Sequence, residues 1–401
     1  MSGLRTYLDW NATAPLRPEA RAAMLAALDC VGNASSPHAE GRRARALMEG
    51  AREQIADCLG ADPRRVYFTS GATEAANWLL TPNVGGAASK AAFELLLVGA
   101  SEHACVLEGH RFPSHRVERI PVDGDGVVDL AWLQRRLAEA VARHGVGSTL
   151  VALQAANNET GVLQPLAAIA GVLAAAQATW VCDAVQAAGR IVLDLTVLGR
   201  GALFLSGHKL GGPKGVGAVV FASDALAPEP LLRGGGQERR QRSGTENIAA
   251  IAGLAAALAA TISEQDEVAA LSRHLQRRFE LGLRSLSSDV VIFSEAVPRL
   301  ANTTCFALPG IAAETALIAL DLDGVAVSSG SACSSGKVAR SHVLEAMQAA
   351  PALRAAALRV SSGGASSELE IDACLAALRR LAEGQAKRHL QRVKVRDREV
   401  A

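Results

Sequence analysis

Short, mostly apolar runs alternate with longer helical patterns along the first 250 residues. The runs are too short for helices and predict buried strands at 66–69, 95–98, 149–153, 180–182 and 203–205. Stretches rich in Ala, Arg and Glu, such as 19–29 and 42–59, are typical of helices. Because strands separated by helices pair side by side, we predict an α/β protein with a mainly parallel sheet covered on both faces.

The pattern changes near Glu246. A long Ala/Leu-rich helix is expected to begin there and to lead into a smaller C-terminal domain. In that part, strands are predicted at 302–306 and 358–361, and helices at 313–320 and 368–383. We therefore expect two domains: a large one of residues 15–260, and a small α+β one of residues 1–14 and 261–401.

The composition is that of an ordinary globular protein. The 401 residues are 49% hydrophobic, and 41 basic side chains balance 40 acidic ones, so nothing predicts nucleic acid or a membrane surface as a partner. No apolar run reaches membrane-spanning length and the N-terminus lacks a signal-peptide core, which predicts a cytoplasmic protein. The seven cysteines form no Cys-x-x-Cys pair, so neither a metal site nor a disulfide framework is expected.

Polar residues follow the predicted strands, at the edge where ligands of parallel α/β sheets bind. After the strand at 66–69 comes a Ser-Gly turn and then a helix start at Ala72 and Thr73. The free N–H groups of this turn and the Thr73 hydroxyl would make a phosphate cradle, and the alternative is a simple capped helix. Two further candidates are His103 and the pair Asn157–Asn158. His103 is either a packing or capping residue or a catalytic group that stacks on an aromatic cofactor and moves protons near neutral pH. The asparagines are either turn residues or amides aimed at a ligand.

Asp183 and Lys209 follow successive buried strands. A carboxylate at the end of a buried run needs a cationic partner or several hydrogen bonds, and a protonated pyridine nitrogen would serve as the cation. Gln186 lies three residues beyond Asp183 and can reach the same ligand. Lys209 stands on a glycine-flanked turn, where burial would free its amine for Schiff-base chemistry. Together with the phosphate cradle and His103, these residues predict a pyridoxal 5′-phosphate site.

Three later features add to this picture. The glycine- and arginine-rich segment 232–247 is either a solvated loop or an anion-binding loop. Cys333 lies among small polar residues on a Ser/Gly loop, which favours a reactive thiol, whereas Cys58, Cys182, Cys305 and Cys374 are expected to be inert. Arg359, inside a strand-like run, either clamps a substrate carboxylate or forms a structural ion pair.

The chain resembles the NifS/IscS-type cysteine desulfurases of the class V aminotransferase superfamily, which are fold-type-I pyridoxal-phosphate enzymes. The resemblance covers nearly the whole chain and rests on segments in a fixed order, namely 7–15, 32–38, 69–74, 102–103, 157–161, Asp183 with Gln186, 206–209, 242–247 and 328–333. It implies a large domain with a sheet of the seven-stranded type and a smaller domain carrying the catalytic cysteine loop. The loop Ser328-Ser-Gly-Ser-Ala-Cys333 is similar to that of the branch that hands sulfur directly to acceptor proteins.

The resemblance also implies roles for individual residues. Lys209 would hold the cofactor and move protons, and Cys333 would attack the sulfur of L-cysteine, leaving L-alanine and a persulfide. Arg359 would bind the substrate carboxylate. The remaining contacts would be Asp183 to the pyridine nitrogen, Gln186 and Asn158 near the ring oxygen, His103 stacked on the ring, and Ala72, Thr73, Ser206 and His208 on the phosphate. Thr245 would reach a phosphate across a homodimer interface.

Two residues depart from the family pattern. Trp10 stands where asparagine is usual and Ala14 where threonine is common, which puts substrate or partner contacts there in doubt. A selenocysteine lyase or another class V enzyme is the alternative activity, and an inactive scaffold that binds acceptors is an alternative of another kind. The sequence leaves the sulfur acceptor open among iron–sulfur cluster assembly, thiolated tRNA, cofactor synthesis and DNA phosphorothioation.

Overall fold

The computed structural model of the chain describes residues 5–84, 91–329 and 341–399, with side chains described up to residue 385. The chain divides into two compact units. The larger contains Thr13–Asn158 and Val162–Gln265, and the smaller contains Met1–Ala12, Glu159–Gly161 and Asp266–Ala401. The domain limits expected from the sequence, 15–260 against 1–14 with 261–401, stay a prediction.

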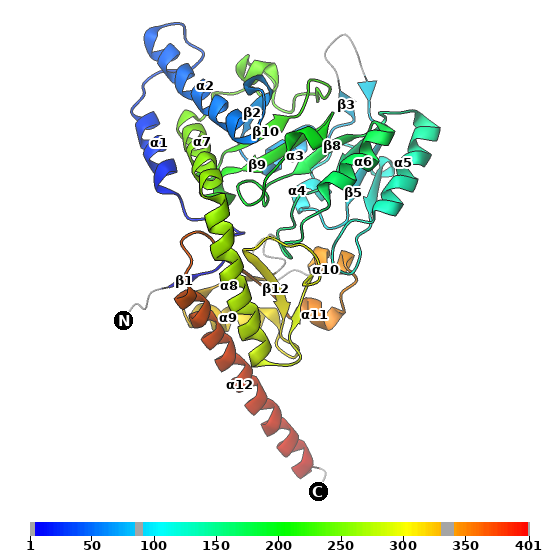
Figure 1. Ribbon diagram of the computed structural model, residues 1–401, viewed down its shortest axis with the longest axis vertical. Coiled ribbons are helices and arrows are strands. Elements are labelled where there is room, and N and C mark those ends of the chain that lie inside the picture. The colour runs from blue at the N-terminus through cyan, green and yellow to red at the C-terminus, as the bar shows by residue number, and fades with distance from the viewer. Residues whose placement is uncertain (1–4, 85–90, 330–340, 400–401) are drawn as a thin grey trace. The chain divides into compact units, whose positions relative to one another are not determined.

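A seven-stranded sheet forms the centre of the large unit (Figure 1). Its strands run in the order β2 (Val66–Thr69), β10 (Gly217–Phe221), β9 (Ala202–Ser206), β8 (Thr179–Asp183), β7 (Thr149–Ala152), β5 (Leu95–Gly99) and β6 (Val117–Ile120). Only β10 is antiparallel to its neighbours. The predicted α/β fold with a mainly parallel sheet is therefore confirmed.

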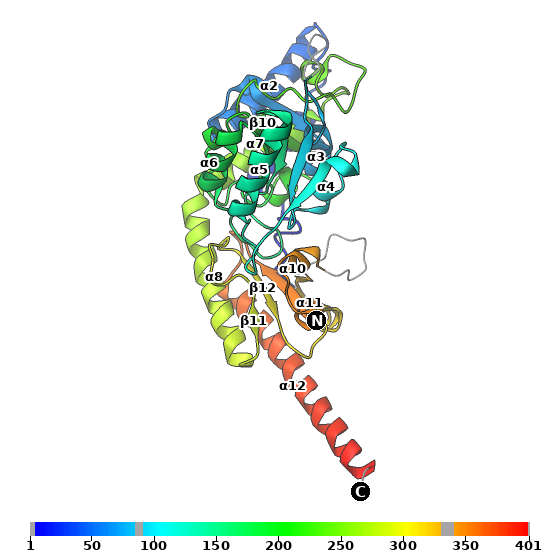
Figure 2. The ribbon, with the colours of Figure 1, turned by 90° about the vertical axis from the view of Figure 1, so that its right-hand side faces the viewer.

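Helices cover this sheet, some of them directly and others by packing on a further helix. The helices of the large unit are α1 (Pro18–Leu28), α2 (Ala39–Leu59), α3 (Ala72–Leu79), α4 (Ala104–Leu107), α5 (Leu130–His144), α6 (Leu166–Ala176) and α7 (Ile248–Ser263). α1, for example, packs on α7. On α3, Ala75, Ala76, Trp78 and Leu79 pack on sheet residues such as Phe204 and Val219. Figure 2 shows α3 and α4 on one side of the sheet and α5 and α6 on the other.

Short elements complete the large unit. β3 (Asn83–Val84) pairs with β4 (Ala91–Ala92). Single 3-10 turns occupy Pro63–Arg65, Ser114–Arg116, Leu195–Leu198, Gly207–Lys209 and Gln237–Arg240. The turn Gly207–Lys209 directly follows β9 and begins the connection to β10, so the predicted lysine turn between two strands is confirmed.

The small unit is built on a four-stranded antiparallel sheet in the order β11 (Val291–Ile292), β12 (Thr303–Ala307), β15 (Ala357–Ser361) and β14 (Ser328–Ser329). β1 (Thr6–Tyr7) pairs with β13 (Val325–Ala326). The helices are α8 (Gln265–Leu286), α9 (Ala313–Leu322), α10 (His342–Ala346), α11 (Pro351–Ala355) and α12 (Glu368–Glu399), and α12 runs beside α9 (Figure 1). Leucines and phenylalanines from α8, β12 and α12 form its core.

The long helix expected from about Glu246 is two helices, α7 and α8. α7 contains no charged residue from Ile248 to Ser263, whereas α8 is amphipathic with buried Leu275, Phe279 and Leu283. Glu264 ends α7, and its carboxylate accepts a hydrogen bond from Arg17 at 2.7 Å. Among the described residues no single helix is long and apolar enough to cross a membrane, and α7 with α8 passes that test only as a pair, by length and composition.

Strand register brings the candidate residues of the large unit to one edge. Asp183 pairs with Phe204 on β9, two residues before Ser206. Gly217, the first residue of β10, pairs with Ser206 on one side and with Thr69 on the other. A Cβ atom on Gly217 would lie 2.6 Å from the Leu205 carbonyl oxygen and 2.9 Å from the Gly71 Cα. Only glycine therefore allows the ends of β2 and β9 to approach this closely.

Candidate active site

The backbone around Lys209 is held rigidly. Three successive carbonyl oxygens are bound by other parts of the large unit: that of Lys209 by the Arg190 guanidinium (3.2 Å), that of Leu210 by the Thr261 hydroxyl (3.0 Å) and that of Gly211 by the Arg17 amide (2.8 Å). Gly211 has φ +85°, and a Cβ there would meet the Arg17 side chain at 2.6 Å. Motion at this position is therefore confined to the Lys209 side chain.

Asp183 ends β8, next to the strand that leads to Lys209. Its side chain is buried, and one carboxylate oxygen accepts the Val185 N–H at 2.8 Å. Burial raises the pKa of Asp183 to about 6, while that hydrogen bond and the charge of Lys209 oppose the rise. The two residues are therefore close enough to interact. A second cation at this carboxylate would lower its pKa further, which is the property expected of a partner for a protonated ring nitrogen.

A second buried carboxyl, Glu102, lies near Asp183. Burial raises the pKa of Glu102 well above its ordinary value, and the negative charge of Asp183 raises it further. Its Oε1 accepts the Gln154 N–H at 2.5 Å, and the Gln154 amide donates to the Ser101 carbonyl and hydroxyl. Burial and a neighbouring negative charge therefore both favour the protonated form of Glu102. The sequence analysis included Glu102 in a segment shared with the family but assigned it no role.

His103 is the N-cap residue of α4. Its Nδ1 accepts the Cys105 N–H at 3.1 Å, so the ring proton of the neutral form sits on Nε2. The capping role that was one of the two interpretations of His103 is thus present. Its stacking on a cofactor ring stays a prediction, and the cap does not compete with it because the cap uses the Nδ1 atom and not the ring face.

The start of α3 forms the candidate phosphate cradle. Gly71 is the N-cap with φ +153°, and no side chain caps the first turn. The N–H groups at Ala72 and Thr73 therefore begin a helix at its positive end. A Cβ on Gly71 would lie 3.8 Å from the Ser206 Oγ, so the end of β9 adjoins this turn. The predicted phosphate residues Ala72, Thr73 and Ser206 thus come together from two strands.

His208 adds a neutral donor to the same edge. Burial lowers its pKa to about 4, and the charges of Lys209 and Lys214 lower it further. Its Nδ1 lies 3.3 Å from the Thr13 hydroxyl. At neutral pH the ring is therefore uncharged, and it can contact an anion as an N–H donor but not as a cation. Ala14, one of the two residues that differ from the family pattern, follows Thr13 in the chain, and its amide donates to the His208 carbonyl at 2.8 Å.

Gln186 is buried and bound by a residue that the sequence interpretation missed. The guanidinium of Arg190 donates to the Gln186 side-chain oxygen, and also to its backbone carbonyl at 3.2 Å. Gln186 and Arg190 are four positions apart, a spacing that brings two side chains together in a helix-like turn, and this was the signal in the sequence. Asn158, the other amide expected near a ring oxygen, is half-buried and is the last residue of its segment in the large unit.

The glycine- and arginine-rich segment is fastened by two ion pairs. Arg242 forms a two-pronged pair with Glu74 in the first turn of α3, at 2.8 and 3.1 Å. Glu238 forms a fully buried pair with Arg52 of α2, at 2.7 and 3.0 Å. Thr245 is exposed and, with Thr69, Ser70 and Arg242 among others, lines a cavity of about 80 Å³. The segment is therefore fastened to α2 and α3 by two ion pairs while most of its residues are exposed, and anion binding by it stays a prediction.

Arg359 lies in the small unit, on β15. It is buried and donates to the Asp9 carboxylate at 2.6 Å, so the structural ion pair proposed as one interpretation is present. Glu159 is fully buried and faces the same guanidinium, and its carboxylate accepts the Ser341 hydroxyl at 2.6 Å. Burial raises the pKa of Glu159 to about 7. Substrate binding by Arg359 stays a prediction.

Cys333 lies outside the described residues. The six described cysteines are free thiols, and burial raises the pKa values of Cys58, Cys182, Cys305 and Cys374, which makes them poor nucleophiles. In the part of the chain that is described, no group of three His, Cys, Asp or Glu side chains could hold a metal ion. The departing residue Trp10 packs in the small unit on Gly363, where a Cβ would lie 2.1 Å from its ring.

The chain is similar to known proteins along nearly its whole length. The family model described as Aminotransferase class-V matches residues 6–374. An IscS-like cysteine desulfurase from Mycobacterium tuberculosis is 38% identical over 379 residues, 93% of this chain and 95% of that protein. A solved NifS-like protein from Rickettsia africae has 32% identity and a TM-score of 0.83, covering 94% of this chain and 99% of its own. A structure of SspA in complex with cysteine has 26% identity and a TM-score of 0.71, covering 89% and 98%.

Proposed function

Since the chain belongs to the class-V aminotransferase family, among its cysteine desulfurases, we propose that it takes sulfur from L-cysteine with pyridoxal 5′-phosphate bound at Lys209. The family resemblance read from the sequence motifs is confirmed. The observation that carries the proposal is the interaction of Lys209 with the buried Asp183, at the ends of the adjacent strands β9 and β8.

The residues of this edge fit the chemistry of that cofactor. Asp183 is a buried carboxylate whose pKa of about 6 would fall beside a protonated ring nitrogen. The α3 start, Ser206 and the neutral His208 supply N–H and O–H donors for a phosphate without adding a cation. Gln186 and His103 would contact the ring oxygen and the ring face. When bound, pyridoxal phosphate supplies an electron sink for the substrate carbon.

The chain's own groups would then divide the remaining work. Arg359 would bind the substrate carboxylate, and Lys209 would carry protons to and from the substrate carbon atoms. The Cys333 thiolate would attack the substrate sulfur and form a new S–S bond. The electron pair of the broken C–S bond would stay on the substrate carbon, which takes a proton and leaves as L-alanine. Cys333 would then carry a persulfide.

Partners and location extend the proposal. A homodimer is proposed because the family resemblance implies that Thr245 reaches a phosphate across a dimer interface, and an exposed Thr245 is compatible with that role. The persulfide would pass to an acceptor protein, and iron–sulfur cluster assembly is one use of it. We propose the cytoplasm as the location of this reaction.

Two variants test the proposed reaction. The protein reconstituted with pyridoxal phosphate is expected to show the absorbance band of a lysine-bound cofactor, and Lys209→Ala is expected to lose it. Cys333→Ala is expected to keep the band but to stop sulfide release from L-cysteine. A wild-type protein that stays colourless with added cofactor contradicts cofactor binding. Full sulfide release by Cys333→Ala would instead favour a selenocysteine lyase or another class V activity, for which selenocysteine is the comparison substrate.

A further inference from the structure

The orientation of the Gln186 amide is determined by Arg190. A guanidinium carries only N–H donors, so the end of the Gln186 amide that it contacts must be the oxygen. The NH₂ end of the amide therefore points away from Arg190. This assignment follows from hydrogen-bond chemistry and does not depend on how the amide is drawn. Gln186 is buried, so a reversed amide would place two N–H donors against the cation.

The same guanidinium reaches the backbone of the lysine turn. Arg190 Nη1, which donates to the Gln186 side-chain oxygen, also donates to the Gln186 backbone carbonyl at 3.2 Å, and Arg190 Nη2 donates to the Lys209 carbonyl at 3.2 Å. Gly189, between Gln186 and Arg190, has φ +72°, and a Cβ there would lie 2.4 Å from Thr261 Cγ2 of α7. This turn is therefore packed tightly and places the guanidinium between the two residues.

We propose that Arg190 is a positioning residue that presents the Gln186 NH₂ group, and not its oxygen, to the cofactor ring oxygen. By also holding the Lys209 carbonyl, it fixes the position of this amide relative to the lysine turn. The inference deepens the proposed function and rests on it, because it assumes that pyridoxal phosphate binds at Lys209. Lysine could not replace Arg190, since one ammonium group lacks the planar fork that spans both partners. Arg190 acts through Gln186 and makes no contact of its own with the substrate.

A measurable consequence concerns the pH at which the bound cofactor changes its absorbance. An N–H donor at the ring oxygen stabilises the deprotonated chromophore, so its loss raises the pH midpoint of the absorbance change. Other charged or titratable groups near this edge include Asp183 on β8, Glu102, His103 and Cys105 after β5, and His208, Lys209 and Lys214 after β9. These residues are the same in all the variants below, and Arg190→Lys also keeps the positive charge that acts on them.

The test is a pair of substitutions measured alone and together by absorbance titration of the cofactor-loaded protein. Arg190→Met and Gln186→Met are each expected to raise the pH midpoint by about one unit. Arg190→Lys keeps the positive charge and is also expected to raise the pH midpoint. It replaces Arg190→Met in the comparison if Arg190→Met does not fold. In the Gln186→Met background, Arg190→Lys is expected to produce no further shift. Thr261→Val removes the hydrogen bond to the Leu210 carbonyl and leaves the Arg190–Gln186 contact unchanged. It is the control and is expected to leave the midpoint in place.

The outcomes separate the inference from the proposed function. If the wild-type protein binds no cofactor, the proposed function fails before the variants are compared. If it binds cofactor but Arg190→Lys leaves the midpoint unmoved, the inference is wrong and the function stands. The inference is also overturned if Arg190→Lys shifts the midpoint equally with Gln186 or Met at position 186, because its effect would then not pass through that amide. A shift of the same size in Thr261→Val would assign the effect to general loosening of the turn.

Discussion

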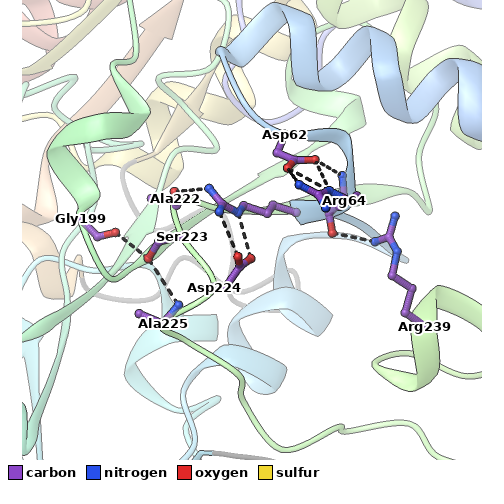
Figure 3. Close-up of polar contacts among 9 residues, drawn as sticks. Asp62, Arg64, Gly199, Ala222, Ser223, Asp224, Ala225 and Arg239 are labelled. Carbon is purple, nitrogen blue, oxygen red and sulfur yellow. Dashed lines mark hydrogen bonds and ion pairs between the residues drawn. The ribbon is translucent and has the colours of Figure 1, made fainter.

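The buried ion pair between Arg52 and Glu238 is predicted to be a principal support of the loop beside the phosphate cradle. Glu238, Arg239 and Arg240 have φ values of +43°, +53° and +65°, a left-handed conformation that costs roughly 1–2 kcal/mol for each non-glycine residue. The three together therefore cost about 3–6 kcal/mol, and the contacts of this segment must offset that amount. Arg239 adds two contacts, a hydrogen bond of 2.9 Å to the Arg64 carbonyl (Figure 3) and a guanidinium position 5.1 Å from the Tyr67 ring centre.

The contacts of the pair are numerous enough for this role. The Arg52 guanidinium holds both Glu238 oxygens, at 2.7 and 3.0 Å, and the Val66 carbonyl at 2.7 Å. One Glu238 oxygen also accepts the Phe68 N–H at 2.9 Å, and the Arg52 guanidinium stacks 4.7 Å from the Phe68 ring centre. Both side chains are almost completely buried. Removing one partner leaves an uncompensated buried charge, which costs about 3–5 kcal/mol.

We therefore predict that Arg52→Met lowers the free energy of unfolding by about 3–5 kcal/mol, and that adding Glu238→Leu to it restores most of the loss. Urea unfolding of the single and double variants measures both quantities. Asp224→Asn is the matched control because it breaks an Arg65–Asp224 pair on the surface of the same unit, and no measurable change is expected (Figure 3). A single variant as stable as the control, or two effects that simply add, would refute this account.

Three further outcomes are expected. Glu159→Gln should be more stable than the wild-type protein by about 3 kcal/mol at pH 8, and this gain should shrink towards pH 4.5. The reason is that the Glu159 carboxyl has a pKa of about 7 in the folded protein, above its ordinary 4.5, so the wild-type protein loses stability as the pH rises through 7. Equal unfolding midpoints at pH 8 would contradict this prediction. Gly217→Ala should weaken pyridoxal-phosphate binding at least tenfold in a fluorescence titration, because the new Cβ would lie 2.6 Å from the Leu205 carbonyl oxygen. Gly171→Ala is the control and should not weaken binding, because a Cβ there would have no atom within 4 Å. Refolding Lys209→Ala together with Thr245→Ala should recover sulfide release that neither variant shows alone, and failure to recover would argue against sites shared between two chains.

Much of the large unit could be predicted from the sequence because its signals are local. The strand β2 begins and ends where its apolar run does, and β5, β7, β8 and β9 differ from the predicted runs by one or two residues at their ends. Since parallel strands align their carboxyl ends, the order Thr73, Asp183, Ser206 and Lys209 along the chain was enough to place these residues at one edge.

The contacts that decide the electrostatics were not predictable in this way. Arg52 and Glu238 are 186 positions apart, and Asp9 and Arg359 are 350 apart, so no local pattern joins them. The Asp9 partner of Arg359 explains why the sequence left its role open between substrate binding and a structural pair. The break at Glu264 was missed because alanine and leucine continue a helical pattern across a bend as readily as through it.

This edge of the sheet selects ligands by charge, because burial leaves some of its ionisable side chains uncharged at neutral pH and others charged. Burial and the charge of Asp183 raise the pKa of Glu102 well above its ordinary value, and His208 is neutral because its pKa is about 4. Asp183, with a pKa of about 6 and Lys209 nearby, therefore carries a negative charge at neutral pH. A ligand with a protonated ring nitrogen is then favoured at Asp183, and its affinity should fall as the pH drops through 6 and the carboxylate is protonated. Asp183→Asn should remove this dependence, and an affinity for pyridoxal phosphate that stays constant between pH 8 and pH 5 in the wild-type protein would show that Asp183 is not the group that selects the cofactor.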